Sequence, residues 1–407
     1  MKTNQFFDGF SRTQVLQLYA CGRCGECILS CPIYEATQDQ NLAPSFKVRA
    51  LKSLADARYG VRAMLFGSKN GNEDEVKRVM ASIYHCTLCG RCMTVCPYVF
   101  DLIELWETVR EQADLNDLAT ELGALPTLNL LGMIKTTVER KNVLGRPHER
   151  RKNWTRRLDV PEKNSAETLY FVGCAISYTP SLKNAAKGVT KILNTAKEDW
   201  AILGEEWCCG IPLKFGGETE HFKEFVTHNV ETIEASGAKR VVFSCPGCYR
   251  MFKQIYPKVL GRPLKFELLH ITELVDDYLK NGKISLVKSK EKITYHDPCE
   301  LARLLGVIEQ PRNVLSELST SFLELPENKV NTLCCGGGGL YKAVDTETSL
   351  EIAKKRIQQV EAMELETLVS ACPSCVMNLH QATRFMKSNV KVRDFADAVS
   401  QQIENVS

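Results

Sequence analysis

Two short stretches decide the fold of this chain: EEWCCGIP at residues 205–212 and NTLCCGGG at residues 331–338. Each holds an adjacent cysteine pair inside a longer pattern that occurs twice. Upstream, TLYFVGC (168–174) matches KITYHDPC (292–299), and downstream VVFSCPGC matches LVSACPSC. Corresponding cysteines of the two copies are 125 to 127 residues apart. A repeat of this length predicts two tandem domains of similar fold.

Strand-like and helix-like runs alternate within each copy. In the first copy, TLYFVG is followed by a helix-like run at 181–196, then by WAILGEE, a second helix-like run and RVVFS. This alternation predicts a parallel sheet with covering helices. Ligands of such sheets gather outside the carboxyl ends of the strands, which is where these cysteines come. The five cysteines of one copy are therefore predicted to converge on one rim.

Five cysteines per copy are one more than a four-iron cubane needs. The first set is Cys174, Cys208, Cys209, Cys245 and Cys248, and the second is Cys299, Cys334, Cys335, Cys372 and Cys375. The fifth thiol is an idle structural cysteine, a redox thiol or a ligand of a cluster that needs five. Both copies retain all five, which disfavours an idle cysteine. Zinc is a further alternative, and it would make the repeat a zinc-stabilised scaffold.

The N-terminal part carries two copies of a different run, C-x2-C-x2-C-x3-C followed by proline. This is the bacterial ferredoxin spacing, in which the fourth cysteine ligates the neighbouring cluster. We therefore predict two cubane [4Fe–4S] clusters. Cys21, Cys24, Cys27 and Cys96 are assigned to one, and Cys86, Cys89, Cys92 and Cys31 to the other. Zinc sites also use four thiolates, but usually as two distant C-x2-C pairs.

A segment of 54 residues separates the two ferredoxin runs. It is longer than a small β-rich ferredoxin would hold, and its first part (KVRALKSLADARYGVRAML, 47–65) is typical of a helix. The sequence therefore predicts an almost wholly helical two-cluster ferredoxin domain. The predicted boundaries are 1–140 for this domain, 141–165 for a basic linker, 166–287 for the first repeat domain and 288–407 for the second. The linker is either a solvated connector or a docking strap against a partner.

All eighteen cysteines fall into these four sets. Disulfide scaffolds are usually short secreted chains, whereas this chain has 407 residues and no apolar leader at its start. No apolar run reaches the roughly 18 to 20 residues that span a bilayer. We predict a cytoplasmic protein without a direct membrane span, associated with a membrane only through a partner. The net charge of +3 gives no reason to predict a nucleic-acid partner.

The whole layout resembles heterodisulfide reductase, either its B-type subunit or its D-type subunit, in which a ferredoxin-like domain is fused to two CCG domains. The resemblance includes the linker phrase GRPHERRKNW (145–154), the HDPC at 296–299 and the glycines after Cys335. It implies that each five-cysteine set holds a non-cubane [4Fe–4S] cluster. It also implies that the two clusters together reduce the disulfide between coenzyme M and coenzyme B, so that these ten cysteines are the catalytic set.

The resemblance also leaves rival functions. Similar CCG proteins serve glycolate, lactate and glycerol-3-phosphate dehydrogenases, accept electrons from electron-transfer flavoprotein or feed menaquinone. The implied small-molecule partner is a thiol or disulfide, and the implied protein partners are a flavoprotein or a membrane cytochrome b. Zinc in one CCG site is the remaining alternative. His296 and Asp297 could donate or relay protons or hold a strand end, and Gly336–Gly339 could admit a close backbone approach or form a flexible turn.

Overall fold

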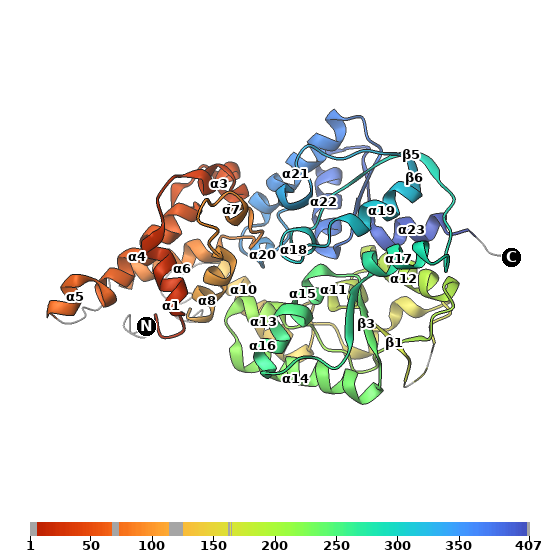
Figure 1. The fold of residues 1–407 in the computed structure, drawn as a ribbon, viewed down its shortest axis with the longest axis horizontal. Coiled ribbons are helices and arrows are strands. Elements are labelled where there is room, and N and C mark those ends of the chain that lie inside the picture. Colours follow the sequence, from red (N-terminus) through yellow and green to blue (C-terminus); the bar gives the residue numbers. More distant parts are fainter. Residues whose placement is uncertain (1–5, 67–72, 114–124, 162, 164, 405–407) are drawn as a thin grey trace. The chain divides into compact units, whose positions relative to one another are not determined.

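The computed structural model describes residues 6–66, 73–113, 125–161, 163 and 165–404. They form two compact units, which are described separately. The first comprises Met1–Ile134, Pro212–Thr219 and Gly336–Ile352, and the second comprises Lys135–Ile211, Glu220–Cys335 and Ala353–Ser407 (Figure 1). The first unit therefore contains the ferredoxin-type runs together with the short segment that follows the cysteine pair of each repeat.

The first unit contains no strand among its described residues. Its N-terminal helices are α1 (Arg12–Ala20), α2 (Glu26–Leu29), α3 (Pro32–Thr37), η1 (Gln40–Leu42), α4 (Pro44–Tyr59), α5 (Val61–Phe66), α6 (Glu73–Tyr84), α7 (Arg91–Thr94), α8 (Leu102–Glu111) and α10 (Leu125–Arg140), which continues into the second unit. The predicted helical ferredoxin-type domain is thus confirmed in its fold.

Local sequence explains where these helices begin and what they bury. α1 begins with a capping box, because the Ser11 hydroxyl accepts from the Gln14 N–H and the Gln14 side chain accepts from the Ser11 N–H. α4 begins with a proline at its first turn, where the missing N–H costs nothing. It buries Val48, Leu51 and Leu54, spaced three apart on one face, and packs against α1 and α6.

The second unit contains two four-stranded parallel sheets with the same topology. One has the order β2-β1-β3-β4 and the other the order β6-β5-β7-β8. The strands are β1 (Thr168–Phe171), β2 (Trp200–Ile202), β3 (Arg240–Phe243), β4 (Glu267–His270), β5 (Ser289–Tyr295), β6 (Ser319–Phe322), β7 (Thr367–Ser370) and β8 (Lys391–Asp394). The prediction of two tandem parallel-sheet domains is confirmed.

Helices connect and cover the strands of both sheets (Figure 1). Two short 3-10 turns, η2 (His148–Arg150) and η3 (Asn153–Thr155), precede β1. The first domain has α11 (Cys174–Tyr178), η4 (Pro180–Leu182), α12 (Lys183–Thr195), α13 (Ile211–Gly216), α14 (Thr219–Ser236), α15 (Pro246–Arg250), the π-helical turn η5 (Met251–Ile255), α16 (Tyr256–Leu260) and α17 (Ile271–Lys280). The second has α18 (Cys299–Ala302), α19 (Glu309–Leu318), η6 (Lys329–Asn331), α20 (Tyr341–Val344), α21 (Thr346–Ala362), α22 (Pro373–Met386) and α23 (Phe395–Gln402). Every residue of β1 and β7 is buried, as expected for parallel strands covered on both faces.

The two sheet domains pack against each other reciprocally. α12 of the first packs on α23 of the second, and the equivalent helix of the second, α19, packs on α17 of the first. Such an exchange of equivalent contacts is what a pseudo-twofold relation produces. The α12–α23 contact is so close that a Cβ added at Gly188 would lie 2.3 Å from the Ala396 carbonyl oxygen. Only glycine fits at this position of α12.

Among the described residues, no helix combines the length and the apolar character needed to cross a bilayer.

Candidate metal centres

The two ferredoxin-type runs have the same backbone conformation. In the first run Arg23 and Gly25 have φ angles of 55° and 87°, and in the second run Leu88 and Gly90 have φ angles of 53° and 75°. The repeated left-handed residues turn the chain between consecutive cysteines, and a short helix, α2 or α7, follows in each case. The Leu88 N–H donates to the Cys86 sulfur at 3.4 Å. The sequence repeat is therefore a repeat of one ligand-presenting loop.

The fourth cysteine of each run lies near the other run. The pKa of Cys31 is raised to about 11, mainly by burial and further by the thiolate charges of Cys86 and Cys89. The pKa of Cys27 is also raised to about 11, by burial, by Cys21 and Cys24, and by Cys96. These neighbours are those of the crossed ligand sets. The ligand assignment itself stays a prediction that this neighbourhood supports.

The two sets differ in exposure to solvent. In the first set, Cys24 is exposed and Cys21 is half-buried, whereas Cys89 and Cys92 of the second set are buried. The buried ammonium of Lys47, which donates to the His85 carbonyl at 3.4 Å, lowers the pKa of Cys31 against the effect of burial. The second set therefore lies inside the unit beside a fixed cation, and the first lies nearer to its surface.

A buried arginine connects the second set to the glycine run that follows Cys335. Arg110 is fully buried and donates to the carbonyl oxygens of Cys86 at 2.8 Å, Ile83 at 3.0 Å and Gly339 at 2.8 Å. A Cβ at Gly339 would lie 2.5 Å from the carbonyl carbon of Thr87. The close backbone approach that the glycines could admit is thus realised at Gly339, against the second ferredoxin-type run.

The first five-cysteine set is brought together on one rim of its sheet. Cys174 follows β1, the cysteine pair follows β2, and Cys245 follows β3. The Cys174 and Cys208 sulfurs are 3.6 Å apart. Hydrogen bonds from Cys208 and Cys248 lower the pKa of Cys209 to about 6, and the Cys248 pKa is raised by its bonds to Cys209 and Cys245. All five thiols are therefore linked in one chain of contacts.

The basic linker packs against this first set, so that it is not a solvated connector over residues 141–154. The carbonyl of Lys141 accepts from the Cys208 N–H at 2.9 Å. The hydrogen bond with Cys208 and burial raise the pKa of Cys174 well above its usual value, and a backbone hydrogen bond from Val143 of the linker partly offsets this rise. Arg151 is 3% exposed and forms an ion pair with Glu206, which is 1% exposed. Glu206 also accepts from the N–H groups of Val172 at 3.0 Å and Gly173 at 2.8 Å. The linker is a strap on its own first domain.

The second five-cysteine set also lies at strand ends. Cys299 follows β5, the pair Cys334–Cys335 comes between β6 and β7, and Cys372 follows β7. Hydrogen bonds with Cys335 and Cys372, together with burial, raise the pKa of Cys375 well above its usual value. The carbonyl of Cys335 accepts from the Asn378 amide at 2.7 Å. The structure thus links Cys335, Cys372 and Cys375 directly, with Cys334 adjacent in the chain.

A buried histidine faces the second set. A ring nitrogen of His296 and the sulfurs of Cys335 and Cys375 lie within 4.8 Å of one another. Burial and then the charge of Arg356 lower the pKa of His296 to about 3, so the ring is neutral. The Arg356 guanidinium donates to the His296 Nδ1 at 3.2 Å, which leaves the ring proton on Nε2. Both side chains are buried, so this tautomer and ring orientation are held in place.

Asp297, the next residue, has a structural role. It accepts two hydrogen bonds from Arg312, each at 2.8 Å, and a third from the Lys329 N–H at 2.8 Å. Arg312 is held in addition by Glu324, at 2.7 Å. The HDPC segment could either transfer protons or hold a strand end. Asp297 fits the second role, and of the two residues only His296 lies near the cysteines.

The two five-cysteine sets are adjacent across the contact between the two sheet domains. α15, which carries Cys248, packs on α18, which begins at Cys299, and the equivalent pair α11 and α22 is also in contact. Arg250 and Glu300 approach to 3.8 Å across the first of these contacts. A Cβ at Gly247 would lie 2.7 Å from the Glu300 carboxylate. The rims therefore meet, as the pseudo-twofold arrangement predicts.

The donor groups fit iron–sulfur clusters. All eighteen cysteines are present as thiols, and each of the four sets is crowded enough for its members to shift one another's pKa. A wholly thiolate donor set is the one that such clusters use. Among the described residues, His296 adds a nitrogen donor at the second five-cysteine set and no histidine does so at the first, and a histidine with two thiolates is also compatible with zinc.

Sequence patterns did not reveal the residues that support these sets. Glu206, Arg151 and Arg356 are single charged residues whose burial depends on the assembled fold. Asn229, fully buried, bonds to the Cys208 carbonyl at 3.1 Å and occupies the place in α14 that Arg356 has in α21. An alignment of the two repeats would have shown asparagine and arginine at this equivalent position. It would not have shown which groups these two side chains bind.

Known sequence families match both parts of the chain. A cysteine-rich domain family matches residues 168–253 and 293–380, and a 4Fe-4S dicluster domain family matches residues 17–99. Among solved structures, a hypothetical protein from Helicobacter pylori aligns with 97% of this chain and 75% of its own, with a TM-score of 0.51 and 10% identity. That likeness concerns the fold alone.

Curated proteins match nearly the whole chain. The D-type subunit of dihydromethanophenazine:CoB–CoM heterodisulfide reductase from Methanosarcina acetivorans is 35% identical over 96% of this chain and 95% of its own length. Its counterpart from Methanosarcina mazei is 34% identical with the same coverage. The EtfAB:quinone oxidoreductase of Syntrophomonas wolfei is 28% identical over 98% of this chain and 60% of its own. Similarity thus extends over both the ferredoxin-type and the duplicated parts.

Proposed function

The chain belongs to the D-type family of heterodisulfide reductase subunits, and we propose that it reduces a disulfide at its paired five-cysteine sets. It is an iron–sulfur oxidoreductase subunit of the heterodisulfide reductase type. The observation that carries the proposal is that both sets are complete and that their helices meet in the reciprocal pairs α15–α18 and α11–α22. A two-electron reaction can be divided between two one-electron centres, which gives a reason for keeping both copies intact.

The proposed reaction is the reduction of R–S–S–R′ by two electrons and two protons to R–SH and R′–SH. The sulfur–sulfur bond breaks, each sulfur gains one electron, and each thiol carries one proton when it leaves. Bound clusters would supply one-electron carriers at the four cysteine sets and, at the five-cysteine pair, iron that can take a sulfur. The substrate of the curated relatives, the CoB–CoM heterodisulfide, is the model for this class of substrate.

His296 is suited to hold a proton at the second set. Its Nδ1 accepts from Arg356, so its Nε2–H remains available on the other side of a buried, neutral ring. A ring nitrogen lies within 4.8 Å of the Cys335 and Cys375 sulfurs. A fixed N–H donor beside developing thiolate charge would stabilise that charge through a hydrogen bond.

The contact between Arg110 and Gly339 supports an order for electron transfer. The exposed Cys24 makes the first ferredoxin-type set the accessible one, and the buried second set shares Arg110 with the glycine run attached to Cys335. We therefore propose that electrons enter at the first set, pass through the second and reach the second five-cysteine set before the first. A flavoprotein or a membrane cytochrome b would be the electron donor.

The test is a disulfide-reductase assay of the iron-loaded chain with reduced benzyl viologen as donor. Oxidation of the dye should depend on the disulfide and yield two thiols per two electrons. Iron analysis of the same anaerobic preparation should give about sixteen irons per chain, from four clusters of four irons. Absence of disulfide-dependent turnover in a preparation with that iron content would reject the proposed reaction.

Electron relay without disulfide chemistry is the second candidate. It is favoured by the similarity to EtfAB:quinone oxidoreductase and to the probable iron-sulfur-binding oxidoreductase FadF of Bacillus subtilis. The relay would give full iron content and dye oxidation by quinone, but no thiol product. A zinc-stabilised second set, which His296 with Cys335 and Cys375 could form, would instead give a lower iron content and a matching amount of zinc.

A further inference from the structure

Two cationic side chains are buried in the helical unit beside the second ferredoxin-type set. Lys47 is 1% exposed and Arg110 is 0% exposed. The Lys47 ammonium donates to the carbonyl oxygen of His85, the residue before Cys86, at 3.4 Å. The Arg110 guanidinium donates to the carbonyl oxygen of Cys86 itself at 2.8 Å. Both cations are therefore fixed beside the segment in which this ligand set begins.

Their positive charge is only partly balanced by carboxylates. Within the described part of the chain, Lys47 bonds to no carboxylate. Glu107, which is 4% exposed, places one negative charge near Arg110. Taking an unbalanced cation out of water is costly unless a nearby anion compensates for it. The thiolates of the second ferredoxin-type set are the anions available here.

The thiols of this set are within electrostatic reach of both cations. Burial lowers the pKa of Arg110, and the thiolate charge of Cys86 is the largest influence in the opposite direction. Burial raises the pKa of Cys31, and the charge of Lys47 is the largest influence that lowers it. Lys47 and Arg110 thus act on two different cysteines of one predicted ligand set.

The first ferredoxin-type run has different charges at the corresponding positions. When the two runs are aligned by their cysteines, Arg23 corresponds to Leu88 and Glu26 corresponds to Arg91. Arg23 and Glu26 are exposed and of opposite sign, whereas Arg91 is half-buried. Exposed charges are screened by water and salt, and buried charges much less so. The two runs therefore share one loop conformation but differ in their electrostatic surroundings.

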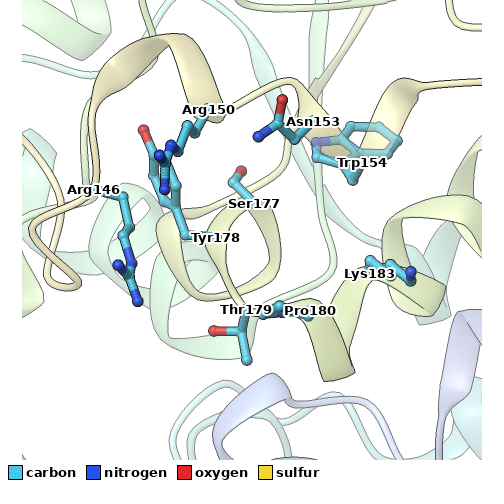
Figure 2. A pocket seen from close by; sticks show the side chains of 9 residues that line it. All are labelled: Arg146, Arg150, Asn153, Trp154, Ser177, Tyr178, Thr179, Pro180 and Lys183. Carbon is cyan, nitrogen blue, oxygen red and sulfur yellow. The ribbon is translucent and has the colours of Figure 1, made fainter.

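A group of cations in the second compact unit illustrates how much burial matters. Arg146, Arg150 and Lys183 line a cavity of about 380 Å³ beside α11 (Figure 2). All three are exposed, so solvent weakens their effect on neighbouring groups. Lys47 and Arg110 are enclosed by protein, where the effective dielectric constant is about 20 and not about 80. The same charge then acts about four times more strongly.

The direction of the effect on electron transfer follows from the signs of the charges. A four-thiolate cluster gains one further negative charge when it is reduced, and its potential depends on nearby charge and solvent exposure. Burial disfavours the more charged, reduced form and so lowers the reduction potential. A fixed cation favours the reduced form and raises the potential. Without Lys47 and Arg110, the buried set would be the weaker electron acceptor of the two.

We propose that Lys47 and Arg110 raise the reduction potential at the second ferredoxin-type set above that at the first, so that an electron passes from the first set to the second. This step moves one electron and neither forms nor breaks a bond. The inference rests on the proposed function, since it supplies the driving force for the order of transfer given there. Both residues act through their charge and take no part in disulfide chemistry.

Anaerobic redox titration of the iron-loaded chain, followed by paramagnetic resonance, measures the two potentials. The signals are assigned by their change in Cys24→Ser and in Cys89→Ser. In the wild-type chain, the second set should have the higher potential. Lys47→Met keeps a long side chain but removes the charge. It should lower the ratio of reduced to oxidised second cluster about tenfold at a given potential, a shift of about 59 mV for one electron. The ratio at the first set should change less than about twofold.

Lys52→Met is the matched control. Lys52 lies in the same helix, α4, but it is 26% exposed and forms an ion pair with Asp56 at 2.7 Å. Its replacement should leave both ratios within about twofold of wild type. Arg110→Gln should lower the second potential in the same direction as Lys47→Met, whereas Arg110→Lys retains the charge and should stay near wild type. This pair separates the effect of charge from that of packing.

The proposal is overturned if Lys47→Met, at wild-type iron content, leaves the second potential unchanged or lowers both potentials equally. It is also overturned if the first set has the higher potential in the wild-type chain. If Lys47→Met does not assemble the second cluster, Arg110→Gln and Arg110→Lys decide, and equal potentials in these two variants reject the role of charge.

The titration contains no disulfide, so failure of this inference can be told apart from failure of the proposed function. The predicted potentials in a chain that reduces no disulfide would support the role of Lys47 and Arg110 and reject the disulfide reaction. Disulfide reduction by a chain whose potentials do not respond to Lys47→Met or to Arg110→Gln would reject the role of the two cations and leave the disulfide reaction in place.

Discussion

The two five-cysteine sets have the same scaffold but different surroundings. His296 lies three residues before Cys299, the first cysteine of the second set. The equivalent residue of the first domain is Phe171, which packs on Phe243 and Phe252 with ring centroids 5.4 and 5.0 Å away. The first set is enclosed by the strap and the Arg151–Glu206 pair, whereas the second has the neutral His296 held by Arg356. Both domains thus have the five cysteines, but the charged and hydrogen-bonding residues around these cysteines differ.

This difference suggests that the two equivalent sites have different roles in the reaction. Both domains have five thiols at strand ends, the donor set that we propose holds a cluster. The buried groups beside the two sets differ: the first has the Arg151–Glu206 ion pair, and the second has Arg356 with the neutral His296. We propose that the two sets share the two electrons of the reaction, with the second set receiving them first.

The largest effect is expected from the cysteine pairs themselves. Cys209→Ser and Cys335→Ser should each abolish disulfide turnover, because both sets are needed to divide the two electrons. The clusters of the ferredoxin-type sets should still be reduced by dithionite, which visible and paramagnetic spectra of the same samples would show. If one of the two variants retained full activity with the native donor, the two sets would not be partners in the reaction.

The next effect concerns the strap. Glu206→Gln leaves the Arg151 guanidinium buried without its carboxylate, and loss of such a partner costs about 3–5 kcal/mol. A similar change in the second domain, Asp297→Asn at another buried ion pair, should cost less, because Arg312 keeps Glu324. Chemical unfolding of the two variants measures both losses. Equal losses would mean that the strap does not hold the first domain more tightly than Arg312 holds the second.

His296→Asn should lower disulfide turnover about 100-fold, the usual effect of removing one fixed hydrogen-bond donor that stabilises developing negative charge. Asparagine retains a polar side chain next to Arg356 but lacks the imidazole ring that lies near Cys335. The iron content of the variant and dithionite reduction of its clusters show whether the second set is still assembled. Phe171→Leu, at the equivalent place in the first domain, is the control and should keep turnover within about twofold of wild type. A loss in the control as large as that in His296→Asn would indicate a packing effect common to both sites.

The smallest expected effect concerns the helix caps of the two domains, which should make stability depend on pH in opposite directions. Asp394 caps α23 where His270 caps α17, and burial raises the Asp394 pKa from 3.8 to about 7. The folded state therefore favours the neutral carboxyl. Its contribution to stability is complete below about pH 4 and is lost as the pH rises through about 7. Asp394→Asn should remove this slope from the thermal midpoint measured between about pH 5 and 8.

His270 provides the opposite slope. Burial lowers its pKa from 6.5 to about 3, so its contribution is present above pH 6.5 and is lost as the pH falls towards 3. His270→Asn should therefore stabilise the chain relative to wild type most at the acidic end of the range, whereas Asp394→Asn should do so at the neutral end. Identical pH profiles for the two variants would show that neither cap titrates as described.

The sequence predicted the fold because the signals that determine it are local and repeated. The alternation of TLYFVG with helix-like runs indicated a parallel sheet, and even the short runs KFELLH and VKVRDF correspond to β4 and β8. The spacing of the cysteines indicated which thiols belong together. It also pointed to Cys31 as a neighbour of the second run, where the structure has it.

The surroundings of the cysteines could not be predicted in this way. Whether residues 141–154 were a solvated connector or a strap depended on where Arg151 and Trp154 become buried, and an Arg-rich sequence fits both. Likewise, the HDPC segment predicted the same two possible roles for His296 and Asp297. Their roles differ because of their partners: Arg356 binds the His296 ring, which lies near the cysteines, and Arg312 forms an ion pair with Asp297. A single charged residue that becomes buried through contacts distant in the sequence leaves no periodic pattern and no motif in the sequence.

We propose that substrate sulfur binds at the five-cysteine sets and not at the ferredoxin-type sets. The most direct measurement is paramagnetic resonance of the oxidised, iron-loaded chain before and after addition of 2-sulfoethanethiol. We expect the thiol to change a signal that disappears in Cys335→Ser or Cys209→Ser, while the signals of the ferredoxin-type clusters stay the same. This expectation is contradicted if the thiol changes no signal, or if it changes only those that depend on Cys21 or Cys86.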